Sequence, residues 1–252
     1  MQSFTRLALL AVVVFVLHFA AVAQSNSLGP SHQLAGFNYK EKVENAASDA
    51  KNLPLIIALH WSSSTPDEFA PFVSGFAKPV RILLLEGPYT HPRSGFSFFV
   101  RSPKNYYEDL TADEKMANLM QEGEKLSKFI EAAVALYSPK RKPVIIGASQ
   151  GGDLSYVTAI RYGSIVSAAF PLLATVDDRI IHDKATRKKP APIYSYHGTD
   201  DPIVPISTAE QHIKVLKAAG YKAELHFYKG IRHDIPDVMK MDYVRRISLI
   251  LF

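Results

Sequence analysis

A glycine-flanked serine is the first feature of this sequence that could do chemistry. The segment Gly147-Ala148-Ser149-Gln150-Gly151 reads G-x-S-x-G and follows the apolar run Pro143–Ala148 directly. A strand, a sharp turn and a helix in that order form a nucleophile elbow, which exposes a serine hydroxyl at the end of a strand. Glycine suits the two flanking positions because side chains there would collide across so tight a turn. The segment predicts Ser149 as a nucleophile, with a glycine-rich turn and an incidental serine as the alternative.

A serine nucleophile needs a base to take its proton and a carboxylate to orient that base. Asp200, Asp201 and Pro202 follow one downstream apolar run, and His233 follows the next in a short loop led by a glycine. Serine, aspartate and histidine in that chain order are one of the known arrangements of such a triad. Pro202 biases Asp201 towards an extended conformation, so Asp201 is the predicted acid, His233 the base and Asp200 a turn residue.

The other histidines are not expected to bind metal. No pair has the H-E-x-x-H spacing, and the chain contains no cysteine. His60 and His197 close strands and are expected to hydrogen-bond loop backbone. Solvent exposure is the expectation for four histidines in loops or on a helix, which are His32, His91, His182 and His212. A serine nucleophile with such a triad transfers an acyl group without a metal or another cofactor, so none is expected here.

Apolar runs of strand length must position these groups, and helical patterns separate several of them. The runs are Leu53–His60, Arg81–Gly87, Pro143–Ala148, Ser167–Ala174, Pro192–His197 and Ala223–Tyr228. Strands that are apolar on both faces and alternate with helices predict an α/β fold with a mainly parallel sheet between helices. Ligands on such sheets bind at the carboxyl ends of strands, where all three triad candidates lie. No insertion is long enough for a large cap domain.

Two helices are marked by capping-box pairs. Thr111 and Glu114 precede one helical pattern, and Ser207 and Glu210 precede another. Gly220 is expected to end the second helix, because glycine readily adopts the left-handed conformation that terminates helices.

The first residues are typical of an export signal. Arg6 precedes an apolar run that ends in the small-residue cleavage pattern Ala21-Val22-Ala23. We therefore expect residues 1–23 to be a removed signal peptide, residues 24–252 to form one domain, and the mature protein to be secreted or periplasmic. An uncleaved membrane anchor is the alternative, although the run is short for a membrane span.

Charge and cysteine content exclude several classes of function. The formal net charge is +5, yet the only dense basic run, Arg187-Lys188-Lys189, is typical of a solvated loop rather than a nucleic-acid patch. Without cysteine the chain has no disulfide, thiolate metal site or cysteine nucleophile. The expected partner is a small-molecule ester, with no nucleic acid and no stable membrane insertion after signal removal; the oligomeric state is not predicted.

Together these motifs resemble the phospholipase/carboxylesterase family of α/β-hydrolases, which includes acyl-protein thioesterases, with some similarity to dienelactone-hydrolase-like enzymes. The matching segments are LIIALHW at 55–61, GASQGG at 147–152, HGTDDPIVP at 197–205 and YKGIRHDI at 228–235. The resemblance implies the α/β-hydrolase fold, with Ser149 as nucleophile, Asp201 as acid and His233 as base. It also implies an oxyanion hole formed by the backbone N–H groups of Gln150 and Ser62.

The loop after the first apolar run departs from the family pattern. The family usually has His-Gly there, whereas this chain has His60-Trp61-Ser62-Ser63-Ser64. Trp61 cannot take a positive φ without strain, so a different loop path is expected. Trp61 forms either a wall of the substrate pocket or a ring packed on the core. The same two interpretations apply to the aromatic segment 89–107, in which Phe98 and Phe99 are the candidate substrate-binding residues.

The predicted function is hydrolysis of carboxylic esters through an acyl-enzyme on Ser149. The same triad could instead act on a thioester, a lysophospholipid or a peptide, because specificity depends on the pocket. A non-catalytic binding protein on this fold would be expected to lack a triad residue, and all three are present.

Overall fold

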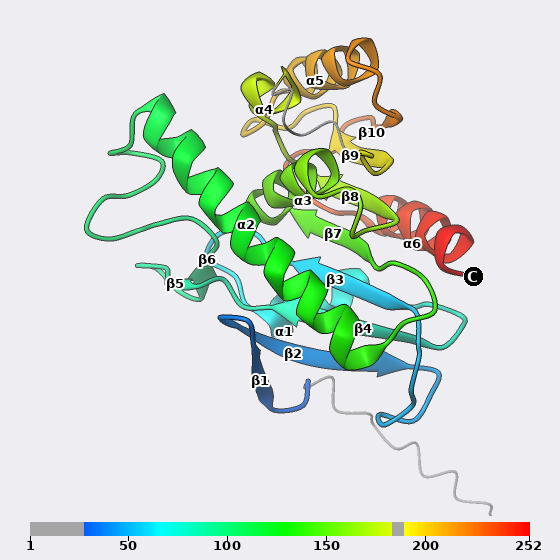
Figure 1. Cartoon of the computed structure of the whole chain (residues 1–252). Coiled ribbons are helices and arrows are strands. Elements are labelled where there is room, and N and C mark those ends of the chain that lie inside the picture. Colours follow the sequence, from blue (N-terminus) through cyan, green and yellow to red (C-terminus); the bar gives the residue numbers. More distant parts are fainter. Residues whose placement is uncertain (1–27, 183–188) are drawn as a thin grey trace, which may run out of the picture.

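The computed structural model describes residues 28–182 and 189–252, so the candidate signal peptide and most of the basic run lie outside the described residues. An eight-stranded sheet runs through the domain in the order β1-β2-β4-β3-β7-β8-β9-β10 (Figure 1). These strands are β1 (Ser31–Leu34), β2 (Phe37–Glu44), β3 (Leu55–Leu59), β4 (Val80–Leu85), β7 (Val144–Ala148), β8 (Ala168–Leu172), β9 (Ile193–Gly198) and β10 (Ala223–Tyr228).

The six predicted strands are confirmed, and all neighbours among them pair in parallel, from β4 through β3, β7, β8 and β9 to β10. Two further strands were not predicted: β1 and β2 form an antiparallel edge that joins β4. The sequence of β2, Phe-Asn-Tyr-Lys-Glu-Lys-Val-Glu, lacks a continuous apolar run, because only one of its faces is buried against the core. A short separate hairpin consists of β5 (Tyr89–Thr90) and β6 (Phe96–Ser97).

Helices cover both faces of the sheet, as the alternation of strands and helices predicted (Figure 1). The helical segments are α1 (Pro66–Phe69), η1 (Ala70–Val73), α2 (Ala112–Tyr137), α3 (Gln150–Arg161), α4 (Asp178–His182), α5 (Ile206–Ala218) and α6 (Asp237–Leu251). Alternate strand residues face opposite sides. Ile57 and Ile145 pack with residues of α2 to α5, while Ile56 and Ile146 pack with α1, η1 and α6. This double burial explains the apolar runs of the central strands.

The start of α2 is as predicted. Thr111 accepts a hydrogen bond from the Glu114 backbone N–H, and the Glu114 side chain accepts one from the Thr111 backbone. No helix in the described ranges is long and apolar enough to cross a membrane.

The start of α5 differs from the prediction, whereas its end agrees. The helix begins one residue before Ser207, with Pro205 at the N-cap, and Ser207 and Glu210 make no capping box. Proline supplies the fixed φ needed to enter a helix, and it does so ahead of the serine. At the other end Gly220 has a φ of 88° and donates its N–H to the Lys217 carbonyl, closing the helix.

Candidate active site

The serine motif forms the predicted strand, sharp turn and helix. Ser149 follows β7 directly and is the first residue before α3, with φ 52° and ψ −114°. A non-glycine residue at positive φ costs on the order of 1–3 kcal/mol, and such strain gathers at functional sites. A Cβ on Gly147 would overlap the Gly151 carbonyl, and a Cβ on Gly151 would overlap the Leu59 carbonyl. The two glycines therefore allow the turn that presents Ser149 at the carboxyl end of the sheet.

Asp201 and His233 are in direct contact. His233 Nδ1–H donates to Asp201 Oδ2 over 2.7 Å, and the other carboxylate oxygen accepts the backbone N–H groups of Ile203 and Val204 at 2.8 and 2.9 Å. Asp201 is only 5% exposed, so these three hydrogen bonds stabilise its buried charge. A proton held on Nδ1 leaves Nε2 of His233 as the basic nitrogen.

The neighbouring Asp200 points away from this pair and is exposed. Its carboxylate accepts the Thr199 hydroxyl at 2.7 Å, and its backbone N–H donates to the Ile231 carbonyl at 2.9 Å. The structure thus places Asp201, and not Asp200, beside His233, as the effect of Pro202 on the backbone predicted.

The third member of the candidate triad lies at the same end of the sheet. Ser149 follows β7, Asp201 follows β9 and His233 follows β10, and these strands run parallel to one another. Within residues 28–182 and 189–252, neither Ser149 Oγ nor His233 Nε2 makes a hydrogen bond to any other group. Ser149 is half-buried, so its hydroxyl remains accessible to a reacting group.

The histidines that close strands hold loop backbone, as predicted. His60 accepts the Gly87 N–H on Nε2 at 3.1 Å and donates from Nδ1 to the Trp61 carbonyl at 2.6 Å. Burial lowers the pKa of His60 to about 4, so the ring is neutral near pH 7. His197 donates from Nε2 to the Val204 carbonyl at 2.8 Å and thereby fixes the loop that carries Asp201.

Two other histidines are buried rather than exposed, which corrects their prediction. His91 is 5% exposed and accepts the Arg93 N–H within the β5–β6 hairpin, and His212 is 9% exposed on the inner side of α5. Burial lowers the pKa of both rings. His32 and His182 are exposed as predicted. In the described part of the chain, no group of three or more His, Cys, Asp or Glu side chains is placed to hold a metal ion.

One candidate oxyanion donor, Gln150, lies on the serine turn itself, and the other, Ser62, lies on the loop after β3. Within the described ranges the backbone N–H groups of Ser62 and Gln150 have no hydrogen-bond acceptor. The positive φ of the loop falls on Ser63, at 64°, and not on Trp61. Ser63 donates its N–H to the Phe96 carbonyl at 2.9 Å, so the β5–β6 hairpin supports this glycine-free loop.

The proposed substrate contacts of Phe98 and Phe99 are wrong. These side chains are 1% and 0% exposed, which leaves no surface for a substrate to touch. The Phe98 ring packs against His60, with centroids 4.8 Å apart, and Phe99 stacks on Tyr106 at 4.4 Å. The hairpin turns both rings inward, so this part of the aromatic segment belongs to the core.

Trp61 was interpreted either as a wall of the substrate pocket or as a ring packed on the core, and its position partly fits both. Its indole packs edge-on against Phe69 and Phe72, with ring centroids 5.8 and 5.4 Å apart. The residue nevertheless stays half-buried, so part of the ring remains accessible beside the candidate oxyanion loop.

Asp153 is a further group near the serine that the sequence analysis missed. It lies one helical turn after Ser149, donates its N–H to the Ser149 carbonyl at 2.9 Å and accepts the Thr175 N–H on Oδ1 at 2.9 Å. It forms no ion pair with any described residue. Burial raises the pKa of Asp153 to about 8. A carboxylate four residues after the serine could have revealed it, because residues i and i+4 share a helix face.

Asp153 should make the stability of the protein depend on pH. Its pKa rises from 3.8 to about 8 on folding, so between these values the native state holds a proton that the unfolded chain has lost. The free energy of unfolding should therefore fall with rising pH, by up to about 4 kcal/mol between about pH 5 and about pH 8. Asp153→Asn should remove this part of the fall, as measured by urea unfolding of both proteins. If the free energies of unfolding of the wild type and Asp153→Asn changed with pH in parallel, the raised pKa of Asp153 would be contradicted.

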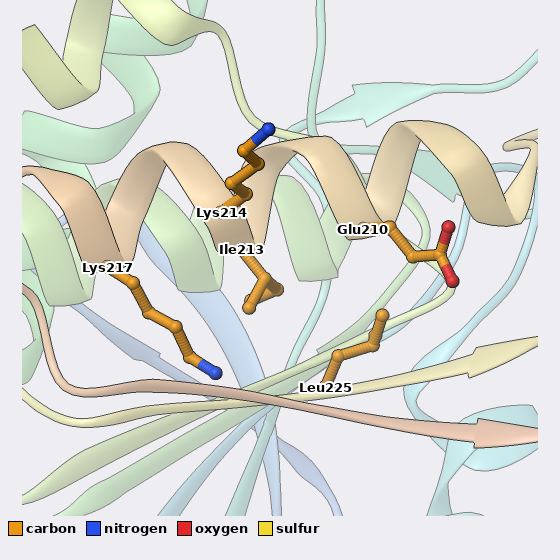
Figure 2. Close-up of a pocket in the computed structure, with 5 residues that line it drawn as sticks. All are labelled: Glu210, Ile213, Lys214, Lys217 and Leu225. Atoms are coloured by element: carbon orange, nitrogen blue, oxygen red, sulfur yellow. The ribbon is translucent and has the colours of Figure 1, made fainter.

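A separate pocket of about 310 Å³ lies between α5 and β10. Figure 2 shows the residues that line it, which are Glu210, Ile213, Lys214, Lys217 and Leu225. They include no triad candidate, so we assign the candidate active site from the side-chain geometry at the serine turn.

Comparison with known proteins agrees with the fold described above, a mainly parallel sheet between helices. Residues 101–250 match the family described as phospholipase/carboxylesterase. Acyl-protein thioesterase 1 of Gibberella zeae is 29% identical over 132 residues, which cover 48% of this chain and 55% of that protein. The chain thus matches just over half the length of this relative.

Solved structures with similar folds extend over most of the chain. Esterase PE8 superposes with a TM-score of 0.70 at 18% identity and covers 84% of this chain and 99% of its own. A carboxylesterase from Mesorhizobium loti has a TM-score of 0.70 at 17% identity, with 87% and 98% covered. At these identities the likeness concerns the fold, a mainly parallel sheet between helices. The family match spans more than half of the sequence, and the chain therefore belongs to the phospholipase/carboxylesterase family of α/β-hydrolases.

Proposed function

We propose that this protein hydrolyses carboxylic esters through an acyl-enzyme on Ser149. The observation that carries the proposal is the 2.7 Å hydrogen bond from His233 to the buried Asp201, at the end of the sheet where the serine turn lies. A histidine held in this tautomer by a carboxylate is the base that a serine nucleophile requires.

In the proposed mechanism Ser149 Oγ attacks the ester carbonyl carbon while His233 Nε2 takes the hydroxyl proton. Asp201 keeps the other proton on Nδ1 and stabilises the imidazolium that forms. The N–H groups of Gln150 and Ser62, which have no acceptor among the described residues, donate to the carbonyl oxygen as it gains negative charge. His233 then protonates the leaving alcohol, and a water molecule repeats the sequence on the acyl-enzyme.

Thioester hydrolysis is the second candidate, because the curated relative is an acyl-protein thioesterase. Both reactions pass through a tetrahedral intermediate to the same acyl-enzyme, and they differ in the leaving group. Family membership also leaves lysophospholipids within the range of substrates to be tested.

A panel of p-nitrophenyl esters of increasing acyl length, assayed beside the matching thioesters, tests the proposal. We expect saturable hydrolysis of at least one ester and covalent labelling by a fluorophosphonate. Selective turnover of thioesters would favour the second candidate. A folded protein that neither turns over any compound nor reacts with the probe would contradict the acyl-enzyme mechanism.

The proposal includes export of the protein. Its support is the apolar N-terminal run and the pattern Ala21-Val22-Ala23, both of which lie outside the described residues. Protein recovered from its native host should therefore begin near Gln24, and intact mass spectrometry measures this directly. A mass that includes residues 1–23 would instead indicate a retained anchor.

A further inference from the structure

Arg101 brings a positive charge to the candidate oxyanion loop. Its Nη2 donates to Ser62 Oγ over 2.6 Å and its Nη1 donates to Asn105 Oδ1 over 2.9 Å. The guanidinium also lies over the Tyr107 ring, 5.0 Å from the centroid. Among the described residues it pairs with no carboxylate, in contrast to Arg81, which is bound to Glu41. The hydrogen bonds and the ring contact that hold Arg101 therefore involve neutral groups.

The same guanidinium is connected to the second candidate donor. Arg101 Nε donates to Ser97 Oγ over 3.4 Å. That hydroxyl donates to the Phe99 carbonyl at 2.7 Å and lies 3.2 Å from Gln150 Oε1. Gln150 Oε1 also accepts the backbone N–H of Phe98 at 3.1 Å. Arg101 thus contacts the loop of Ser62 and also Ser97, whose neighbour Phe98 holds the side chain of Gln150 at the start of α3.

Ser62 lies in a loop that has no glycine and adopts a positive φ at Ser63. A mobile N–H in such a loop would stabilise an oxyanion poorly, because the benefit of an oxyanion hole depends on donors fixed in advance. A hydrogen bond from a guanidinium to a hydroxyl is charge-assisted and directional, so it can fix the position of Ser62. It leaves the backbone N–H of Ser62 free for a substrate.

We propose that Arg101 is a positioning residue of the oxyanion hole, which holds Ser62 and Gln150 at their mutual spacing and lends its positive charge to the developing oxyanion. This inference rests on the proposed ester hydrolysis. It predicts an effect on the chemical step rather than on substrate binding, because the negative charge exists only in the transition state.

Replacing the guanidinium tests the inference. Arg101→Met should lower kcat for a short-chain p-nitrophenyl ester by about 10- to 100-fold and change KM by less than about 3-fold. Arg101→Lys keeps the charge but cannot reach Ser62 and Asn105 together. Its kcat should therefore lie between that of the wild type and that of Arg101→Met. Affinity for a boronic acid that forms a tetrahedral adduct on the serine should fall in parallel with kcat.

Arg93→Met is the matched control, because Arg93 is an exposed arginine in the loop of the β5–β6 hairpin, which precedes Arg101, and its side chain makes no described hydrogen bond. It should keep wild-type kcat. Ser62→Ala removes the acceptor but keeps the backbone N–H. It should reproduce part of the loss, and its combination with Arg101→Met should be less than additive. Ser62→Ala alone tests the link if Arg101→Met fails to fold.

The outcomes separate this inference from the proposed function. Wild-type kcat in folded Arg101→Met, beside an inactive Ser149→Ala, would overturn the role of Arg101 and leave ester hydrolysis intact. Loss through KM alone would also overturn it. A wild-type protein that lacks activity and does not bind the boronic acid would overturn both.

Discussion

Ser149→Ala is expected to abolish ester hydrolysis, with kcat reduced by ~10⁴-fold or more. In the proposed mechanism the acyl-enzyme forms on this hydroxyl, which alanine lacks. Stability should change little, because the Ser149 side chain is half-buried and makes no hydrogen bond within the described ranges. The melting temperature should therefore stay close to that of the wild type, as measured by differential scanning calorimetry.

A fluorophosphonate probe provides the direct test of this substitution. It should label the wild type and fail to label Ser149→Ala. Ser138→Ala is a matched control, because Ser138 is also a serine at positive φ, with φ 46°, but it caps the end of α2. The control should keep full labelling. Labelling that persists in Ser149→Ala would place the nucleophile at another residue.

Local sequence signals predicted the parts of this site that depend on backbone conformation. The two glycines around Ser149 are required by close backbone contacts, so a five-residue pattern was enough to indicate the turn. Pro202 restricts the residue before it, which singled out Asp201 from its neighbour. The central strands were equally readable, because burial on both faces leaves continuous apolar runs.

The features that were mispredicted depend on tertiary contacts. Nothing in the local pattern of Phe98 and Phe99 distinguishes a ring that lines a pocket from one that packs on His60 or Tyr106. Their burial follows from the β5–β6 hairpin, whose pairing with Ser64 brings together residues distant in sequence. The antiparallel edge of β1 and β2 escaped prediction because polar residues alternate along it. Arg101 escaped because its role depends on contacts with Ser62 that spacing cannot reveal.

Asp201→Asn should lower kcat by about 10²- to 10⁴-fold, whereas Asp200→Asn should change it by less than about 3-fold. In Asp201→Asn the amide oxygen can still accept the N–H groups of Ile203 and Val204, which donate to the carboxylate of the wild type over 2.8 and 2.9 Å. The amide nitrogen would then face His233 and donate to Nδ1. This moves the imidazole proton to Nε2, so the ring can no longer take the proton of Ser149.

The neighbouring substitution lacks this effect. Asp200 is exposed, and among the described residues its carboxylate accepts only the Thr199 hydroxyl, a bond that an asparagine oxygen can keep. The measurement is kcat of both purified variants on one short-chain ester, with circular dichroism to confirm that each is folded. Because the two residues are adjacent and Asp201, unlike Asp200, is hydrogen-bonded to His233, the pair separates tautomer control from general effects of lost charge. A folded but nearly inactive Asp200→Asn beside an active Asp201→Asn would reverse the assignment of the triad acid.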